Sequence, residues 1–323
     1  MHILKGYTKQ EISWMMYDWA NSAHSVIIVT LLPIFFDTVA GYTADSVSSM
    51  STWGYATSIA MLIVALAAPF LGVFGDIRGM RKKLFSFFML LGVAACAGMA
   101  FTPGMDFTSG PVAAGKVATL ILVLYIVSVI GFDASAIYYD AFLTDVTTED
   151  RMDKVSTMGY GLGYIGGSTI PLLIFLIMNL VGVPMLTCLA FVFGLTAVWW
   201  LAFSLPLLKN CEQTSGKPYE KGDVARSIKG VGTTIKEIIA NKPMLIYILS
   251  YFFYIDGVHT VISMATTYGT NLGLDSTGMM LALLLVQILG LPFCLLYIKC
   301  SEKFGARTMV GFCLLYTSDA ADD

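Results

Sequence analysis

Residues 69–84 read PFLGVFGDIRGMRKKL, and this stretch decides how the rest of the chain is interpreted. It joins the end of one apolar run to the start of the next through a short turn. Asp76 can accept hydrogen bonds from the following helix or from an arginine, Gly79 can make the turn, and Gly72 can let two helices approach closely. The basic residues of the turn are expected to face anionic lipid headgroups: Arg78, Arg81, Lys82 and Lys83. The pattern predicts a basic connection between two membrane-crossing helices.

The composition supports a chain that is largely solvated by lipid. It has 323 residues, of which 57% are hydrophobic and 13% are charged, and its mean hydropathy is +0.75. A soluble domain needs more polar surface than this. The six cysteines show no paired spacing, and with three histidines they form no ligand pattern, so we expect free thiols, no metal and no cofactor.

The apolar runs are long and continuous, which is typical of membrane helices and not of alternating barrel strands. They predict eight complete crossings, at 14–36, 52–74, 84–102, 117–140, 155–180, 183–205, 243–266 and 278–298.

Basic residues are distributed very unevenly over the connections between these runs. With the N-terminus in the cytoplasm, 18 of the 19 lysines and arginines lie on the cytoplasmic side, and only Lys116 lies outside. Such asymmetry is the positive-inside signal. We therefore expect a multi-pass membrane protein with a cytoplasmic N-terminus, in the plasma membrane if the source is bacterial.

The chain divides into an N-terminal six-helix half at 1–205, a linker at 206–242 and a partial second half at 243–316. The linker contains SIKGVGTTIKEII, whose apolar spacing predicts a short surface helix. The apolar stretch TMVGFCLLY at 308–316 is too short to cross, so a ninth helix is begun and not finished. The last residues, 317–323, resemble a cloning scar, and the chain is expected to be a fragment.

Two pairs of segments repeat at a large offset. Residues 21–27 (NSAHSVI) match 256–262 (DGVHTVI) at an offset of 235. The turn Asp76-x-x-Gly79-x-Arg81 matches Glu302-x-x-Gly305-x-Arg307 at an offset of 226. Both pairs relate crossing n to crossing n+6, which is typical of a transporter built from two parallel six-helix halves.

Residues 69–84 resemble the signature loop of the major facilitator superfamily. More narrowly, YDWANSA (17–23), YYDAFLTDV (138–146), GYGLGYIGG (159–167) and YIDGVHTVI (254–262) are similar to the family of autophagy-related vacuolar amino-acid effluxers and their bacterial relatives. The resemblance implies an all-α fold with twelve crossings when complete, secondary transport and, by analogy, amino-acid export. Fold alone leaves the pocket chemistry open.

Polar residues inside the predicted crossings are candidates for a binding site, because burying them in lipid is costly. Asp256 and His259 lie on one face of the seventh crossing, and Asn21 and His24 occupy the matching positions of the first, with Asp18 one turn away. We expect these faces to line a central cavity and to bind substrate or protons; the alternative is hydrogen bonding between helices alone. The histidines either carry a coupled proton or stay neutral and hydrogen-bonded.

Two further helices carry candidate residues. On the fourth crossing, Asp133 could bind a cation or a proton, and Asp140 either latches onto the basic loop at 78–83 or is solvated at the membrane surface. On the fifth, three glycines at four-residue spacing either pack against another helix or let the helix rock: Gly159, Gly163 and Gly167.

The sequence contains no Walker loop, dinucleotide fingerprint or catalytic motif in a confirming context, so we expect neither an ATP-driven pump nor an enzyme. The favoured function is a proton-linked secondary transporter of a small polar solute, such as an amino acid or related metabolite. Alternatives are a broad-specificity efflux transporter and, from another class, a channel or receptor. The expected partners are the solute, a proton and the lipid bilayer, with no nucleic acid, and the expected state is a monomer.

Overall fold

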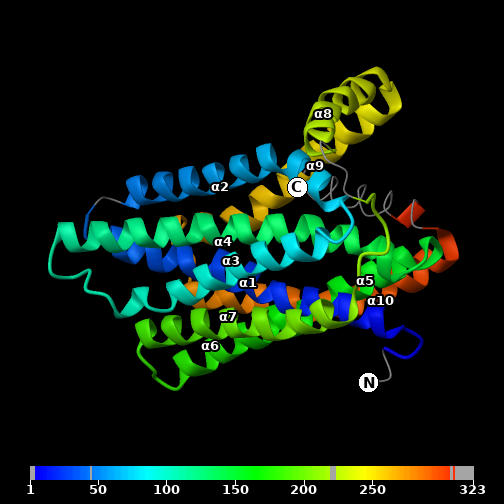
Figure 1. The fold of residues 1–323 in the computed structure, drawn as a ribbon. Coiled ribbons are helices and arrows are strands. Elements are labelled where there is room, and N and C mark those ends of the chain that lie inside the picture. The colour runs from blue at the N-terminus through cyan, green and yellow to red at the C-terminus, as the bar shows by residue number, and fades with distance from the viewer. Residues whose placement is uncertain (1–3, 44–45, 219–222, 306–307, 310–323) are drawn as a thin grey trace.

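The computed structural model describes residues 4–43, 46–218, 223–305 and 308–309. Long helices run side by side along one axis (Figure 1), and the described residues contain no β-strand beyond an isolated bridge between Ile77 and Lys217. The helices, in chain order, are α1 Lys9–Ala40, α2 Ser46–Gly75, α3 Arg81–Met99, η1 Thr102–Gly104, α4 Pro111–Val146, η2 Glu149–Arg151, α5 Met152–Gly163, η3 Tyr164–Thr169, α6 Ile170–Leu180, α7 Met185–Asn210, α8 Asp223–Ala240, α9 Lys242–Asn271 and α10 Ser276–Phe304.

The described residues contain seven helical segments that are long and apolar enough to cross a membrane, and an eighth if the bent pair α8–α9 is counted as one. The run predicted at 155–180 is a single span, Glu149–Leu180, although it is divided into α5, η3 and α6. The run predicted at 243–266 falls in α9, which meets α8 at a bend of 99°. The prediction of an all-helical membrane protein is confirmed.

The predicted linker contains the helix α8, which projects beyond the main bundle (Figure 1). Its apolar spacing had predicted a surface helix in this segment. The other predictions for the C-terminal part, an unfinished ninth helix and a non-native tail, fall almost wholly on residues 310–323 and so lie outside the described residues.

Helix α1 is the centre of the bundle. In its most apolar window 72% of the residues are buried, against 11% for α2, and Ile27, Ile28, Leu31 and Leu32 are completely buried. Met15 is buried as well, and with about 3.6 residues per turn these five side chains point to all sides of the helix, so α1 is surrounded by its neighbours. Its polar side chains must therefore find partners or a cavity inside the protein.

Helix α1 lies backbone to backbone against the fifth span. A Cβ atom added to Gly159 would lie 2.6 Å from Oδ2 of Asp18, one added to Gly163 would lie 2.5 Å from Oγ of Ser22, and one added to Gly167 would lie 2.5 Å from the carbonyl oxygen of Trp19. Only glycine leaves room for such an approach.

The fifth span contains a turn of π-helix, η3, at the level of these contacts. The hydroxyl of Thr169 donates a hydrogen bond of 2.7 Å to the carbonyl oxygen of Tyr164, five residues earlier. A π-helical turn shifts the register between the helix before it and the helix after it. The side chains of α5 and α6 consequently face directions that a continuous α-helix would not give.

The expectation for Gly72 is wrong. A Cβ atom at this position would meet no atom within 4 Å. The close approach lies instead at Gly75, one turn later, where an added Cβ would lie 3.0 Å from the ring of Tyr138. The two glycines are one turn of α2 apart, and only Gly75, at the end of the helix, lies against α4.

The glycine contacts predict a contrast in stability. Gly167→Ala should lower the free energy of unfolding by about 1–3 kcal/mol, because its methyl group has no space against α1. The matched change Gly72→Ala should leave stability unchanged or raise it by up to about 1 kcal/mol, since its methyl group enters open space in a helix. Thermal unfolding of the purified protein in detergent measures both; equal melting temperatures for the two variants would contradict the packing described here.

Candidate functional site

A cavity of about 420 Å³ lies beside the middle of α1. Helices α1, α4, α5 and α10 and the π-helical turn η3 contribute its walls. Its lining combines polar, aromatic and aliphatic side chains. The described lining residues are Asp18, Asn21, Ser22, Ser25, Val26, Val29, Thr30, Phe132, Tyr160, Tyr164, Ser168, Leu283, Val286 and Gln287. The volume is suited to a small solute, and we call this space the central cavity.

The polar part of the cavity wall follows from helical spacing on α1. Asp18, Asn21, Ser22 and Ser25 are separated by three and four residues and therefore share one face. Two of these residues, Asp18 and Asn21, were predicted as site residues, and the structure brings them together in one wall.

His24 does not lie in this wall, contrary to expectation. It is six residues from Asp18, which turns it toward α4 and α7. Its Nε2 atom lies 3.2 Å from Oγ of Ser128, its ring stacks on Phe132 with a centroid distance of 4.8 Å, and Trp200 contacts it from α7 at 5.2 Å. The side chain is only 2% exposed and does not line the central cavity.

Asp18 is held in place from α4. The hydroxyl of Tyr139 donates a hydrogen bond of 2.8 Å to its Oδ2 atom. Tyr139 is itself fixed by Trp14, whose ring stacks on it at 4.3 Å and whose Nε1 donates to the Tyr139 carbonyl oxygen at 2.9 Å. No lysine, arginine or histidine of the described residues forms an ion pair with Asp18. The carboxylate is therefore positioned but has no cationic partner in this part of the chain.

Sequence reasoning missed the residues that face Asp18 from the fifth span and from α10. Tyr160, Tyr164 and Gln287 line the cavity there, and Oε1 of Gln287 is buried with no hydrogen-bond partner in the described part of the chain. The signal was present, since Gln287 is a single amide inside the apolar run LLLVQILG at 283–290. The rule that polar residues within membrane helices deserve attention would have found it.

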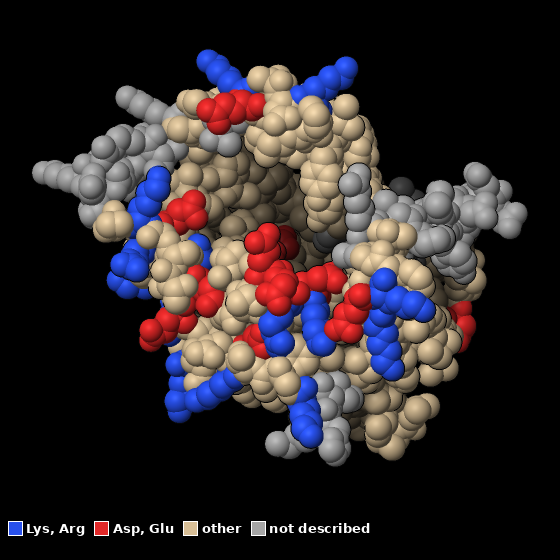
Figure 2. All heavy atoms as spheres, turned by 90° about the vertical axis from the view of Figure 1, so that its right-hand side faces the viewer, with Lys and Arg blue, Asp and Glu red and all other residues tan. Residues whose placement is uncertain are grey.

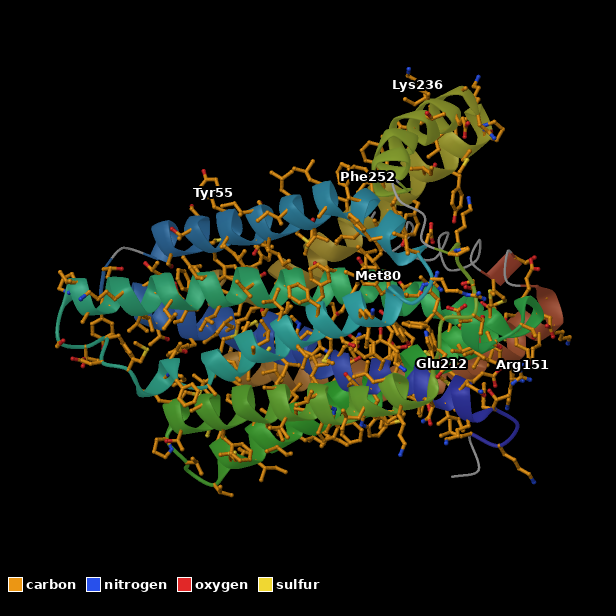
Figure 3. The ribbon with its side chains drawn as sticks, viewed as in Figure 1. Tyr55, Met80, Arg151, Glu212, Lys236 and Phe252 are labelled. Carbon is orange, nitrogen blue, oxygen red and sulfur yellow. The ribbon has the colours of Figure 1, made fainter. Side chains whose placement is uncertain are left out.

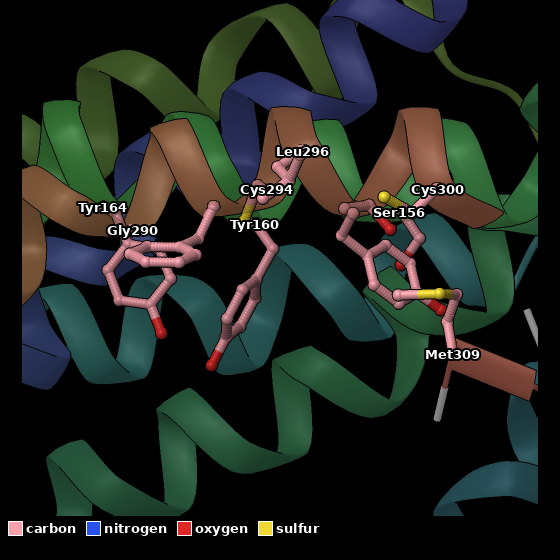
Figure 4. A pocket seen from close by; sticks show the side chains of 11 residues that line it. Ser156, Tyr160, Tyr164, Gly290, Cys294, Leu296, Cys300 and Met309 are labelled. Carbon is pink, nitrogen blue, oxygen red and sulfur yellow. The ribbon is translucent and has the colours of Figure 1, made fainter. Parts of the chain in front are cut away.

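Tyr160 and Tyr164 also border a second space, of about 580 Å³, between the fifth span and α10. Figure 4 shows both tyrosines close to Gly290 and Cys294. A Cβ atom added to Gly290 would lie 2.5 Å from the Tyr164 ring, so α10 lies directly against this ring. The two tyrosines thus separate the central cavity from the outer face of the α5–α10 contact.

Asp256 lies elsewhere, in a cavity of about 700 Å³ between α2 and α9. Ser58 and Tyr55 of α2 share this space. The predicted meeting of Asp256 with Asn21 and Asp18 in one cavity is not found, because α9 presents this position to α2. His259 is in α9, but its side chain lies outside the described residues.

Asp133 lines neither of these cavities. Its Oδ2 atom is buried and has no hydrogen-bond partner among the described residues. Asp133 also interacts electrostatically with Tyr125 of the same helix. An unpartnered carboxylate oxygen inside a helical bundle is costly unless it binds a proton or a cation. Asp133 therefore stands apart from the central cavity, contrary to the expectation of one shared site.

One end of the bundle carries most of the interactions between charged side chains. We call it the charged end; it contains residues 76–83, 145–154, 211–218 and 301–305. Viewed from this side, it shows basic and acidic side chains mixed around a hollow (Figure 2). Figure 3 labels three residues of these segments, Met80, Arg151 and Glu212.

Asp145, at the end of α4, organises the charged end. It forms an ion pair with Arg81, and its Oδ1 atom accepts hydrogen bonds from the backbone and hydroxyl groups of Thr214 and Ser215 at 2.7–3.1 Å. Arg81 is 4% exposed, so it does not face lipid headgroups as expected. Asp140, the predicted partner of this loop, forms no ion pair with a described residue. It is five residues before Asp145 and points to another side of α4.

The first residues of the linker, 211–218, are bound to the α2–α3 turn; we call them the linker strap. Lys217 exchanges backbone hydrogen bonds with Asp76 and Arg78 at 3.1 and 2.9 Å. Gln213 accepts from the Gly79 amide at 2.8 Å and donates to the Gly75 carbonyl at 3.0 Å. Gly79 makes the turn with a φ of 80°. The Asp76 carboxylate lies 3.9 Å from Arg81 and is 81% exposed, so it contributes little to this network.

A second network ties α1 to the loop before α5. Glu11 caps its own helix by accepting from the Thr8 amide at 2.7 Å, and it also accepts from Thr147 at 2.6 Å and from Arg151 at 2.9 Å. Sequence reasoning did not single out Glu11, although Thr8-x-x-Glu11 has the spacing of a capping box.

Two contacts join α5 to α10 at the charged end. Lys154 and Glu302 form an ion pair of 2.7 Å, and Ser301 donates to Asp153 at 3.0 Å. Gly305 ends α10 with a φ of 82°. Arg307, which the repeat had matched to Arg81, lies outside the described residues.

The architecture resembles that of solved sugar transporters. The crystal structure of a D-xylose–proton symporter gives a TM-score of 0.57 at 15% identity and covers 92% of this chain and 69% of that chain. A partially occluded, inward-open structure of the xylose transporter XylE from E. coli gives a TM-score of 0.53 at 14% identity. It covers 92% of this chain and 73% of that chain. The fold is that of the major facilitator superfamily of membrane transporters, as predicted.

A family model described as "Vacuole effluxer Atg22 like" matches residues 39–152 and 144–318. The MFS-type transporter YxiO of Bacillus subtilis is 39% identical over 316 residues, which are 95% of this chain and 71% of YxiO. Autophagy-related protein 22-1 of Sclerotinia sclerotiorum is 24% identical over 181 residues, 50% of this chain and 30% of that protein. The chain belongs to the Atg22-like family of MFS-type transporters, which confirms the resemblance found in its sequence.

The charged end predicts different effects for two of its aspartates, Asp145 and Asp76. Asp145→Asn should loosen the linker strap, because it removes the negative charge that binds Arg81 and four hydrogen-bond donors. Asp76→Asn should have little effect. Cys211 reports on the strap: burial raises the pKa of its thiol to about 11, with nearby Lys82 opposing, so the native thiol should react slowly at pH 8.

The measurement is the rate of alkylation of Cys211 by N-ethylmaleimide, followed by mass spectrometry. We expect the alkylation rate to rise about 10-fold or more in Asp145→Asn. This corresponds to a decrease of roughly 1.4 kcal/mol in the free energy of opening the strap. We expect less than a 2-fold change in Asp76→Asn. Unchanged labelling in Asp145→Asn would show that Asp145 does not hold the strap.

Proposed function

We propose that this protein is a secondary active transporter that moves a small polar solute, an amino acid or a related metabolite, across the membrane in a proton-linked manner. The central cavity carries the proposal. It lies between helices that precede the linker and α10, which follows it, so a bound solute would contact both parts of the chain. Such a position suits alternating access around a fixed site.

The solute class is supported by the lining of the cavity. Asp18, Asn21 and Gln287 offer a carboxylate and two amides, serine and threonine offer hydroxyls, and Phe132, Tyr160 and Tyr164 offer aromatic surface. Together they suit a small molecule with polar groups at one end and an apolar part at the other.

Proton coupling is supported by two carboxylates of the bundle, Asp18 and Asp133, which have no cationic partner among the described residues. Each is more easily kept in an apolar bundle when it is neutralised by a proton or a bound cation. His24 is a third candidate for carrying the proton, since its Nδ1 atom is buried without a hydrogen-bond partner among the described residues.

We further propose that the charged end faces the cytoplasm. The segments that carry the excess of lysine and arginine in the sequence gather there, including residues 76–83, 151–154 and the linker. Positive residues are retained on the cytoplasmic side of membranes. In this orientation the N-terminus would lie in the cytoplasm. The proposed membrane is the plasma membrane if the source is bacterial, and the proposed state is a monomer.

The primary test is uptake of radiolabelled amino acids into proteoliposomes that contain the full chain, with and without an imposed pH gradient. We expect saturable uptake of one class that the gradient stimulates. Asp18→Asn should reduce gradient-driven uptake by 10-fold or more, because a permanent amide cannot exchange a proton. The control Ser58→Ala, in the cavity between α2 and α9, should transport like the native protein.

The outcomes separate the remaining functions. Saturable flux of chemically diverse solutes would favour a broad-specificity efflux transporter. Flux that rises linearly with concentration, or single-channel currents, would favour a channel and contradict the proposal.

The ion pair between Lys154 and Glu302 gives a further prediction. If the charged end opens and closes, this pair must break in the open form. Glu302→Lys should favour opening and change the transport rate by about 2- to 5-fold, since an exposed pair contributes less than about 1 kcal/mol. The double variant Lys154→Glu/Glu302→Lys should restore the native rate. A double variant as impaired as the single one would exclude a role for the pairing itself.

A further inference from the structure

The central cavity has an unbalanced charge. Among the fourteen described residues that line it, Asp18 alone carries a formal charge, and none is a lysine, arginine or histidine. A solute with a carboxylate or phosphate would find no cationic partner on this lining, whereas a positive group would find one at Asp18.

The surroundings of Asp18 reinforce this preference. Its neighbour on α4, Asp140, is another carboxylate and is close enough to repel it electrostatically. Tyr139 donates its hydroxyl to one oxygen of Asp18 and so fixes the direction of the carboxylate without neutralising its charge. Asp18 is therefore held in a defined orientation before any solute enters, and an ammonium group can take the place of the proton proposed above.

A second acceptor faces the cavity from the other part of the chain. Gln287 lines the cavity from α10, and its Oε1 atom is buried with no hydrogen-bond partner among the described residues. Leaving such a buried acceptor unpaired is unfavourable, because it has lost its hydrogen bonds to water. A solute that donates an N–H group to this oxygen would remove the penalty.

Aromatic side chains complete the site. Phe132, Tyr160 and Tyr164 contribute three rings to its lining. The faces of such rings attract ammonium groups and also accept an apolar side chain. A carboxylate, an unpaired amide oxygen and three rings in one small cavity are complementary to a protonated amine.

We propose, building on the transport function above, that the central cavity recognises its solute by a protonated amine. Asp18 is the counter-ion, Oε1 of Gln287 is a hydrogen-bond acceptor, and organic amines without a carboxylate bind more tightly than amino acids with one. The ammonium group is thereby held between α1, before the linker, and α10, after it.

The test compares three probes that differ in charge and share one side chain: valinamide, valine and N-acetylvaline. At pH 6.5 valinamide is mostly a cation, valine a zwitterion and N-acetylvaline an anion. Thermal-shift titration of the purified full chain gives the apparent affinity of each. We expect valinamide to bind best, valine more weakly by 3-fold or more, and N-acetylvaline not at all.

Substitutions on the two sides of the cavity test the assigned contacts. Asp18→Asn should lower the affinity for valinamide by about 10- to 100-fold, which is the usual contribution of a hydrogen bond to a charged group. Gln287→Leu should lower this affinity by about 3- to 10-fold, and Gln287→Glu should raise it, because it adds a second carboxylate to the cavity. Tyr139→Phe keeps the charge of Asp18 and should cost less than Asp18→Asn. Gln287→Glu keeps the test decisive if Asp18→Asn fails to fold.

The outcomes distinguish this inference from the transport function. Equal affinity for the three probes, tighter binding of N-acetylvaline, no binding of any probe, or an unchanged affinity in Gln287→Glu would overturn the amine assignment. Uptake of an anionic or uncharged solute into proteoliposomes would overturn it as well, while supporting transport. Tight binding of valinamide without flux of any solute would support the amine site and contradict the transporter.

Discussion

The contact between the backbones of α1 and the fifth span is the constraint on which the central cavity depends. Three glycines bring the two helices to a distance that no side chain would allow, and this places the polar face of α1 opposite Tyr160 and Tyr164. The π-helical turn occurs at the same level and sets the direction of the residues that follow it. A small change in the spacing of these helices would alter the width of the cavity more than a change in any lining side chain.

The charged end shows how a buried carboxylate is stabilised by many weak donors. Asp145 is completely buried as a side chain and is balanced by Arg81, by two hydroxyl groups and by two backbone amides. A buried charge is tolerated only when its partners are nearly complete, and removal of one partner is costly. The arrangement therefore holds α3, α4 and the start of the linker as one unit. Asp76, which is exposed, belongs to the edge of this unit and not to its centre.

Hydropathy predicted which segments cross the membrane, because the length and apolarity of a run are properties of the sequence alone. It could not predict how each helix is rotated about its axis. His24 and Asp18 lie on the same helix, yet only Asp18 reaches the cavity. The same limit explains why Asp145, and not Asp140, meets Arg81. Gln287 is a different case, since it is a single amide with no polar residue three or four positions away, and so it forms no polar stripe in the sequence. Rotation is decided by packing among all helices at once, which no local pattern contains.

The linker strap also restricts how this sequence can change over time. Gln213 and Gly79 are 134 residues apart in the chain, and the amide side chain of one satisfies the backbone of the other. A substitution in the α2–α3 turn that alters its shape will be tolerated only with a matching change in 211–218, and insertions in the strap will be rarer than insertions beyond it. The segment that connects the two parts of the chain should therefore show two patterns of inheritance: a beginning that varies together with a distant turn, and a remainder that varies freely.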